Sequence, residues 1–152
     1  MSDELILGPN RVRVIAHGED TADRFSLVEW RMAPLPAPGP QVHRHLTADE
    51  AFFVIDGQLD VTVDDVTTRL EPGGFAFAPR MTWHTVANAG ADECRFLALF
   101  SPPGFEGLWE QTAALLAAGP ARPEEILTLQ VQFGMDTKDG RARLFDAPQP
   151  PG

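Results

Sequence analysis

Three histidines and one glutamate have the clearest capacity for chemistry in this chain. His43 and His45 are separated by one residue, Glu50 follows His45 by five residues, and His84 lies further along. On an extended strand, residues two apart point to the same face, so the two imidazoles of His43 and His45 would project together, with Cβ atoms roughly 6–7 Å apart. This separation suits two neighbouring coordination positions on one metal ion.

Glu50 and His84 are expected to add two more donors to the same interior. Glu50 would share its face of a strand with Phe52 and Val54, and His84 would share its face with Val86. Three imidazoles and one carboxylate suit a divalent first-row transition metal, with open positions left for water, substrate or dioxygen. Iron, manganese, nickel, cobalt, copper and zinc all accept these donors, so the metal is not named by the sequence.

A structural explanation competes with the functional one for each of these residues. A His-x-His pair on a strand can serve packing and hydrogen bonding alone, but the addition of Glu50 and His84 favours a metal site. His17 lies in a polar turn and is expected to be a solvated loop residue. Cys94 opens an apolar strand and is expected to be a buried, unreactive thiol.

Short β-strands would position these donors. Between residues 11 and 100, short β-like runs, many of them alternating apolar and polar residues, are separated by turn residues such as Asp56-Gly57. Strands are expected over residues 11–15, 25–32, 51–55, 58–63, 66–70, 75–78, 84–87 and 94–100. The proline-rich stretch 33–40 is expected to be an extended loop. Closely spaced strands without intervening helices indicate an antiparallel sandwich or barrel.

The pattern changes from strands to helices after residue 100. Residues 105–118 have apolar side chains near helical spacing, and Pro123-Glu124-Glu125 predicts the start of a second helix that runs to about residue 133. These helices are expected to cover the mouth or side of the barrel, or to reach a second subunit. The whole chain, 1–152, is predicted to be one domain with a barrel core over about 11–100, a helical appendage over about 105–134 and a frayed tail over 146–152.

Length, composition and charge exclude several classes of function. The chain has 152 residues, of which 43% are hydrophobic, and its 13 glycines and 14 prolines favour many tight turns. Its 12 basic and 22 acidic residues give a net charge of −10, which disfavours nucleic acids and membrane surfaces as partners. With neither a signal-peptide pattern nor a stretch of roughly 20 apolar residues, a cytoplasmic location is expected.

Two segments resemble the motifs of the cupin superfamily. Gly39-x3-His43-x-His45-x4-Glu50-x6-Gly57 resembles the first motif, and Gly73-x5-Pro79-x-Met81-x2-His84-x3-Asn88 resembles the second. The resemblance implies an all-β fold, the antiparallel double-stranded β-helix or jelly-roll barrel of small single-domain cupins related to quercetin dioxygenases. Two positions depart from the motifs. Three residues separate Gly39 from His43, where the family usually has five. Met81 stands at a glycine position, which implies a different turn or local strain.

The resemblance also implies a function. His43, His45, Glu50 and His84 would be the metal ligands, and Glu50 would take a proton from a hydroxylated substrate, as in quercetinase-like cupins. The leading hypothesis is a metal-dependent dioxygenase or oxidoreductase acting on an aromatic or enol-type small molecule. One alternative is a non-redox isomerase, cyclase, decarboxylase or lyase that uses Glu50 as a proton shuttle. Another is a small-molecule-binding cupin without catalysis.

The predicted pocket is apolar and partly aromatic, which suits a flat aromatic or polyketide-like ligand. Its expected lining residues are Val28, Trp30, Met32, Phe52, Val54, Val61, Phe75, Phe77, Met81, Phe96 and Phe100. The resemblance also favours a homodimer. Phe105 and Trp109 are candidates for exposed aromatic residues of its contact, with packing inside the chain as the alternative.

Overall fold

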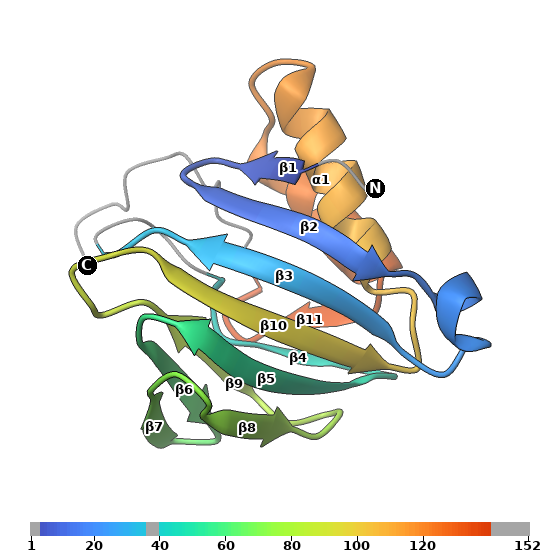
Figure 1. Ribbon diagram of the computed structural model, residues 1–152. Coiled ribbons are helices and arrows are strands. Elements are labelled where there is room, and N and C mark those ends of the chain that lie inside the picture. Colours follow the sequence, from blue (N-terminus) through green and yellow to red (C-terminus); the bar gives the residue numbers. More distant parts are fainter. Residues whose placement is uncertain (1–3, 36–39, 141–152) are drawn as a thin grey trace.

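The computed structural model describes residues 4–35 and 40–140 and contains two antiparallel β-sheets that enclose an apolar interior (Figure 1). The six-stranded sheet has the order β1 (Glu4–Leu7), β2 (Asn10–Ala16), β3 (Ser26–Met32), β10 (Cys94–Ser101), β5 (Asp49–Asp56) and β8 (Phe75–Ala78). The five-stranded sheet has the order β11 (Met135–Thr137), β4 (His43–His45), β9 (His84–Ala87), β6 (Leu59–Val63) and β7 (Val66–Leu70). This arrangement is the expected antiparallel jelly roll.

Alternation of buried and less buried side chains explains why the central strands β5 and β10 form. Along β10, every second residue from Cys94 is buried, and Phe96 and Phe100 are among the most completely buried side chains. The neighbouring β5 buries Phe52 and Val54 on the same interior face. Because residues two apart share a face of a strand, the apolar set of each strand reaches one common core.

Each predicted strand and both predicted helices are present, and the structure adds elements that the sequence pattern did not reveal. The helices are α1 (Glu106–Ala117) and α2 (Pro123–Gln132), and the short 3-10 helix η1 spans Gly18–Thr21. The added strands are β1 and β11, which are too short to show a periodicity. The part of the predicted loop at 36–39 and the predicted frayed tail 146–152 lie outside the described residues.

Helix α1 packs against β1 and β3 at one end of the six-stranded sheet (Figure 1). Phe105 and Trp109 are each only 5% exposed and belong to the main hydrophobic cluster. The Trp109 ring lies 5.1 Å from that of Trp30, centroid to centroid, in an edge-to-face arrangement. The expectation that these aromatic side chains are exposed is therefore wrong, because α1 buries both of them within its own chain.

Three residues expected to line the pocket face outward instead. Phe75, Phe77 and Met81 are 64%, 49% and 49% exposed. Phe75 pairs with Phe53 across β8 and β5, and directly paired residues place their side chains on the same face, here the outer one. The interior positions on β8 belong to Ala76 and Ala78, which pair with Phe52 and Glu50.

Candidate metal centre

The four predicted ligands come together inside the barrel from three strands. His43 and His45 point inward from β4, His84 comes from β9 and is paired with His43, and Glu50 comes from β5 in the opposite sheet. One donor atom from each side chain lies within 4.8 Å of the others, and all four side chains are buried. The structure thus unites the two motifs at one point, where four residues could hold a metal ion.

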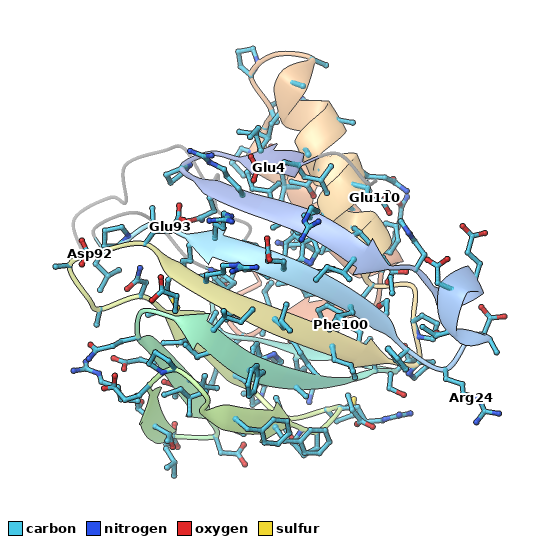
Figure 2. The ribbon with its side chains drawn as sticks, in the orientation of Figure 1. Glu4, Arg24, Asp92, Glu93, Phe100 and Glu110 are labelled. Carbon is cyan, nitrogen blue, oxygen red and sulfur yellow. The ribbon has the colours of Figure 1, made fainter. Side chains whose placement is uncertain are left out.

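Glu50 is one of three buried glutamates in the described part of this acidic protein, together with Glu29 and Glu106. Figure 2 shows Glu4, Asp92, Glu93 and Glu110 on the outside of the molecule, where all four are exposed. Glu50 is only 6% exposed. An ionised carboxylate in such a place requires compensating partners, since burial strongly disfavours its charge.

Hydrogen bonds determine which ring nitrogens face the centre. His43 Nδ1 lies 2.7 Å from the Gln41 carbonyl oxygen, and His84 Nδ1 lies 3.0 Å from the Thr82 carbonyl oxygen. A carbonyl oxygen only accepts hydrogen bonds, so both Nδ1 atoms carry the hydrogen and donate it. Nδ1 of each of these two histidines is therefore held by the backbone and Nε2 is directed at the centre, the orientation that metal-binding histidines commonly have.

The contacts of Glu50 match a cation-binding arrangement. Its Oε1 atom lies 3.0 Å from Nε2 of His45 and 3.0 Å from Nε2 of His84. A carboxylate oxygen and the lone pairs of neutral imidazoles repel one another unless a proton or a metal ion lies between them. His45 Nδ1 is buried without a hydrogen-bond partner among the described residues. The donor set therefore fits a divalent transition metal.

The charges of the centre are strongly coupled. Burial opposes ionisation of Glu50, but hydrogen bonds from His45 and His84 outweigh it and lower the pKa of the carboxyl to about 2. Burial, reinforced by the neighbouring His84 and His45, lowers the pKa of His43 to about 3. Burial also disfavours the His84 imidazolium, yet the contact with Glu50 raises its pKa above the ordinary value. At neutral pH the centre therefore contains an ionised carboxylate and a neutral His43.

A small apolar cavity of about 20 Å³ adjoins the ligands. This is room for about one water molecule. Its lining consists of His43, Glu50, His84, Trp30, Met32, Pro40, Phe52, Val86, Phe96, Phe105 and Trp109. Of the predicted lining residues, Val28, Val54, Val61 and Phe100 are buried in the core but do not line this cavity.

Aromatic residues of the C-terminal segment complete the cavity, and the sequence pattern did not place them there. The centroid of the Phe105 ring lies 4.2 Å from that of the His45 ring. Trp109 lines the cavity and packs against Trp30, which lines it as well. The only sequence signal was the apolar spacing of the helix, which shows that one face is buried but not against which partner.

The turn before His84 places Met81 in a backbone conformation that favours glycine. Met81 has a φ of 67°, in the left-handed region that favours glycine. Its backbone N–H donates to the carbonyl oxygen of His45 across 2.8 Å. The positive φ supports the predicted local strain, and the hydrogen bond ties the turn to the strand that bears two ligands.

Comparison with known proteins agrees with this geometry. Residues 30–100 match the family model of the cupin domain. Residues 30–100 form a cupin domain, which bears out the predicted resemblance to the cupin superfamily. Over 102 residues it is 32% identical to germin-like protein subfamily 2 member 2 of Arabidopsis thaliana, an alignment that covers 64% of this chain and 46% of that protein. This cupin thus spans about half the length of that curated relative.

Solved structures confirm the jelly-roll fold of this cupin. KdgF from Halomonas sp. is 22% identical with a TM-score of 0.60, over 69% of this chain and 90% of that chain. The polyketide cyclase RemF from Streptomyces resistomycificus is 24% identical with a TM-score of 0.55, over 66% and 73% of the two chains. At these identities the likeness is one of fold.

Both helices of the described part of the chain fall short of the length and hydrophobicity that a membrane-spanning helix needs.

Proposed function

We propose that this cupin is an enzyme that holds one divalent transition metal through His43, His45, Glu50 and His84. The observation that carries the proposal is the contact of one buried Glu50 oxygen with Nε2 of both His45 and His84, beside a His43 whose Nδ1 is engaged by a backbone carbonyl. Iron, manganese, nickel, cobalt, copper and zinc all suit these donors.

The character of the cavity favours an aromatic or enol-type substrate. Apart from the ligands, its lining side chains are apolar, with neither lysine nor arginine among the described residues that line it. A phosphate or dicarboxylate substrate would need such cations, whereas an aromatic ring suits this environment. The net charge of −10 also disfavours anionic substrates.

Glu50 would be the catalytic residue as well as a ligand. Its carboxylate is the only one that lines the cavity among the described residues, so it is the group placed to accept a proton from a substrate hydroxyl. A redox-active metal, when bound, would allow the deprotonated substrate to react with dioxygen. The proposed reaction is therefore a dioxygenase reaction, in which both oxygen atoms enter the product.

Metal analysis combined with oxygen uptake tests this proposal. We expect the untagged protein to contain a near-stoichiometric transition metal and the His84→Ala variant to lack it. Catechols, flavonols and enols would then be screened for metal-dependent oxygen consumption. Full activity of the metal-free protein would overturn the proposal. Turnover that persists without oxygen and with zinc would replace the dioxygenase by a non-redox isomerase, cyclase, decarboxylase or lyase with Glu50 as proton shuttle.

The homodimer and the cytoplasmic location expected from the sequence stay predictions. Since Phe105 and Trp109 are buried, a dimer contact would use other side chains. Phe53, Phe75 and Phe77 lie together on the outer face of the six-stranded sheet, with exposures of 43%, 64% and 49%. Exposed apolar patches of this kind often mark protein contacts. Sedimentation of a monomeric wild-type protein would contradict the dimer.

A further inference from the structure

A groove far larger than the central cavity lies on the other side of His45. Its volume is about 470 Å³, and it runs between the turn at residues 102–105 and the end of α2 at residues 131–134. Pro102, Pro103, Val131 and Phe133 form much of its surface, and His45 contributes a ring edge. The central cavity holds about one water molecule, so an aromatic ligand of the metal centre needs the space that this groove offers.

Phe105 is the one described residue that lines both the groove and the central cavity. Its ring packs against the His45 ring at 4.2 Å and against the Phe100 ring at 4.8 Å, centroid to centroid. It is 5% exposed, so it closes the space between the two cavities. Rotation of this single side chain would connect the groove with the ligands.

His45, which lines the groove, carries a buried polar atom suited to a ligand. Nε2 of His45 faces Glu50, which leaves Nδ1 as the nitrogen on the remaining side of the ring. His45 is 2% exposed, and its Nδ1 lacks a hydrogen-bond partner among the described residues. When Nε2 serves a metal, Nδ1 carries the hydrogen and can donate it to an oxygen atom of a ligand.

The remaining lining of the groove is uncharged. Thr47 and Gln132 provide neutral polar groups. Apart from these two residues and His45, the described residues that line the groove are apolar. A neutral aromatic molecule with an oxygen acceptor matches this surface, whereas an anion would lack a cationic partner.

We propose that this groove binds the substrate, a neutral aromatic small molecule, and that Phe105 is the gate and specificity-determining residue between the groove and the metal centre. The backbone before Phe105 is fixed by hydrogen bonds, so the gate moves by rotation of its side chain. Gly104 N–H donates to Glu106 Oε2 across 2.8 Å, and the Gly104 carbonyl oxygen accepts from Gly107 N–H across 3.1 Å. The identity of the ligand as substrate rests on the proposed function of the metal centre.

The groove is tested first in metal-free protein with the neutral fluorescent probe N-phenyl-naphthylamine. Val131 lines the groove and is 65% exposed, so Val131→Trp fills the groove without disturbing the core. We expect this variant to weaken probe binding by about tenfold or more. Phe75→Ser is the matched control, because Phe75 is 64% exposed on a different surface. Loss of binding in the Phe75 variant, with full binding in the Val131 variant, would overturn the proposal.

The gate is tested in cobalt-loaded protein with phenylimidazole, a neutral aromatic ligand whose binding changes the visible absorption of cobalt. We expect Phe105→Ala to accelerate binding by about tenfold and Phe105→Trp to slow it. Phe75→Ser, on a surface outside the groove and the gate, should bind at the wild-type rate. Phe105→Leu provides an intermediate rate if Phe105→Ala fails to fold. Equal rates of phenylimidazole binding in the wild type and all Phe105 variants would overturn the proposal that Phe105 is a gate.

The two measurements separate the groove from the proposed function. A protein that binds no cobalt overturns the metal-dependent function and, with it, the gate to a metal centre. The naphthylamine measurement still decides whether the groove is a binding site, because it uses metal-free protein.

Discussion

Replacing Met81 by glycine should reveal the strain stored in the turn before His84. The backbone of Met81 has a φ of 67°, and this left-handed conformation costs a residue with a Cβ about 1–2 kcal/mol. Glycine avoids that cost, although it loses about 0.5–1 kcal/mol more backbone entropy on folding. From the midpoints of the two ranges, the net advantage of glycine over alanine at this position is about 0.75 kcal/mol.

The comparison between Met81→Gly and Met81→Ala isolates this strain. Both variants remove a side chain that is 49% exposed, and both keep the N–H that donates to the His45 carbonyl oxygen. They differ only in the Cβ. Urea denaturation of the metal-free proteins, analysed by linear extrapolation, gives the two free energies of unfolding. An alanine variant as stable as the glycine variant, or more stable, would refute the strain argument.

Three further perturbations test the core, the metal centre and the outer face of the sheet. Trp109→Ala should lower the free energy of unfolding by about 3–5 kcal/mol, because Trp109 is 5% exposed and packs on Trp30; a calorimetric melting temperature close to that of the wild type would contradict this packing. Excess transition metal at about 100 times its Kd should raise the free energy of unfolding by about 2.7 kcal/mol, and no such gain should occur in His84→Ala. Glu29 is buried, and although burial raises its pKa, hydrogen bonding and charge from Arg95 lower it below the ordinary 4.5. The folded state then binds fewer protons, so this stabilisation is complete above pH 4.5 and is lost as the pH falls below it; Glu29→Gln should flatten the pH dependence of stability in that range.

The ligand set could be predicted from the sequence because it depends on local patterns. Two histidines separated by one residue share a face of any strand, and the alternation around Glu50 and His84 indicates an inward direction without knowledge of the partner strands. The strand positions themselves were predictable for the same reason, since the period of two residues is a property of each strand.

The outward direction of Phe75 and Phe77 could not be read from the sequence. The run Phe75–Ala78 has four apolar residues in a row, so its own pattern does not distinguish the two faces. Pairing of Phe75 with Phe53 on β5 decides the direction. A shift of one residue in this register would have placed both rings inside the barrel.

The sequence alone indicated an antiparallel sandwich or barrel with three histidines and a glutamate directed inward, because hydrophobic alternation and ligand spacing act over a few residues. The resemblance of its motifs to those of cupins narrowed this to a jelly roll. Only the tertiary structure decided how much room the metal centre has. Phe105 and Trp109, far from the ligands in sequence, fill the barrel beside His45 and leave a cavity of about 20 Å³, with a groove of about 470 Å³ behind Phe105. Long-range packing of side chains sets such volumes, and no local pattern contains that information.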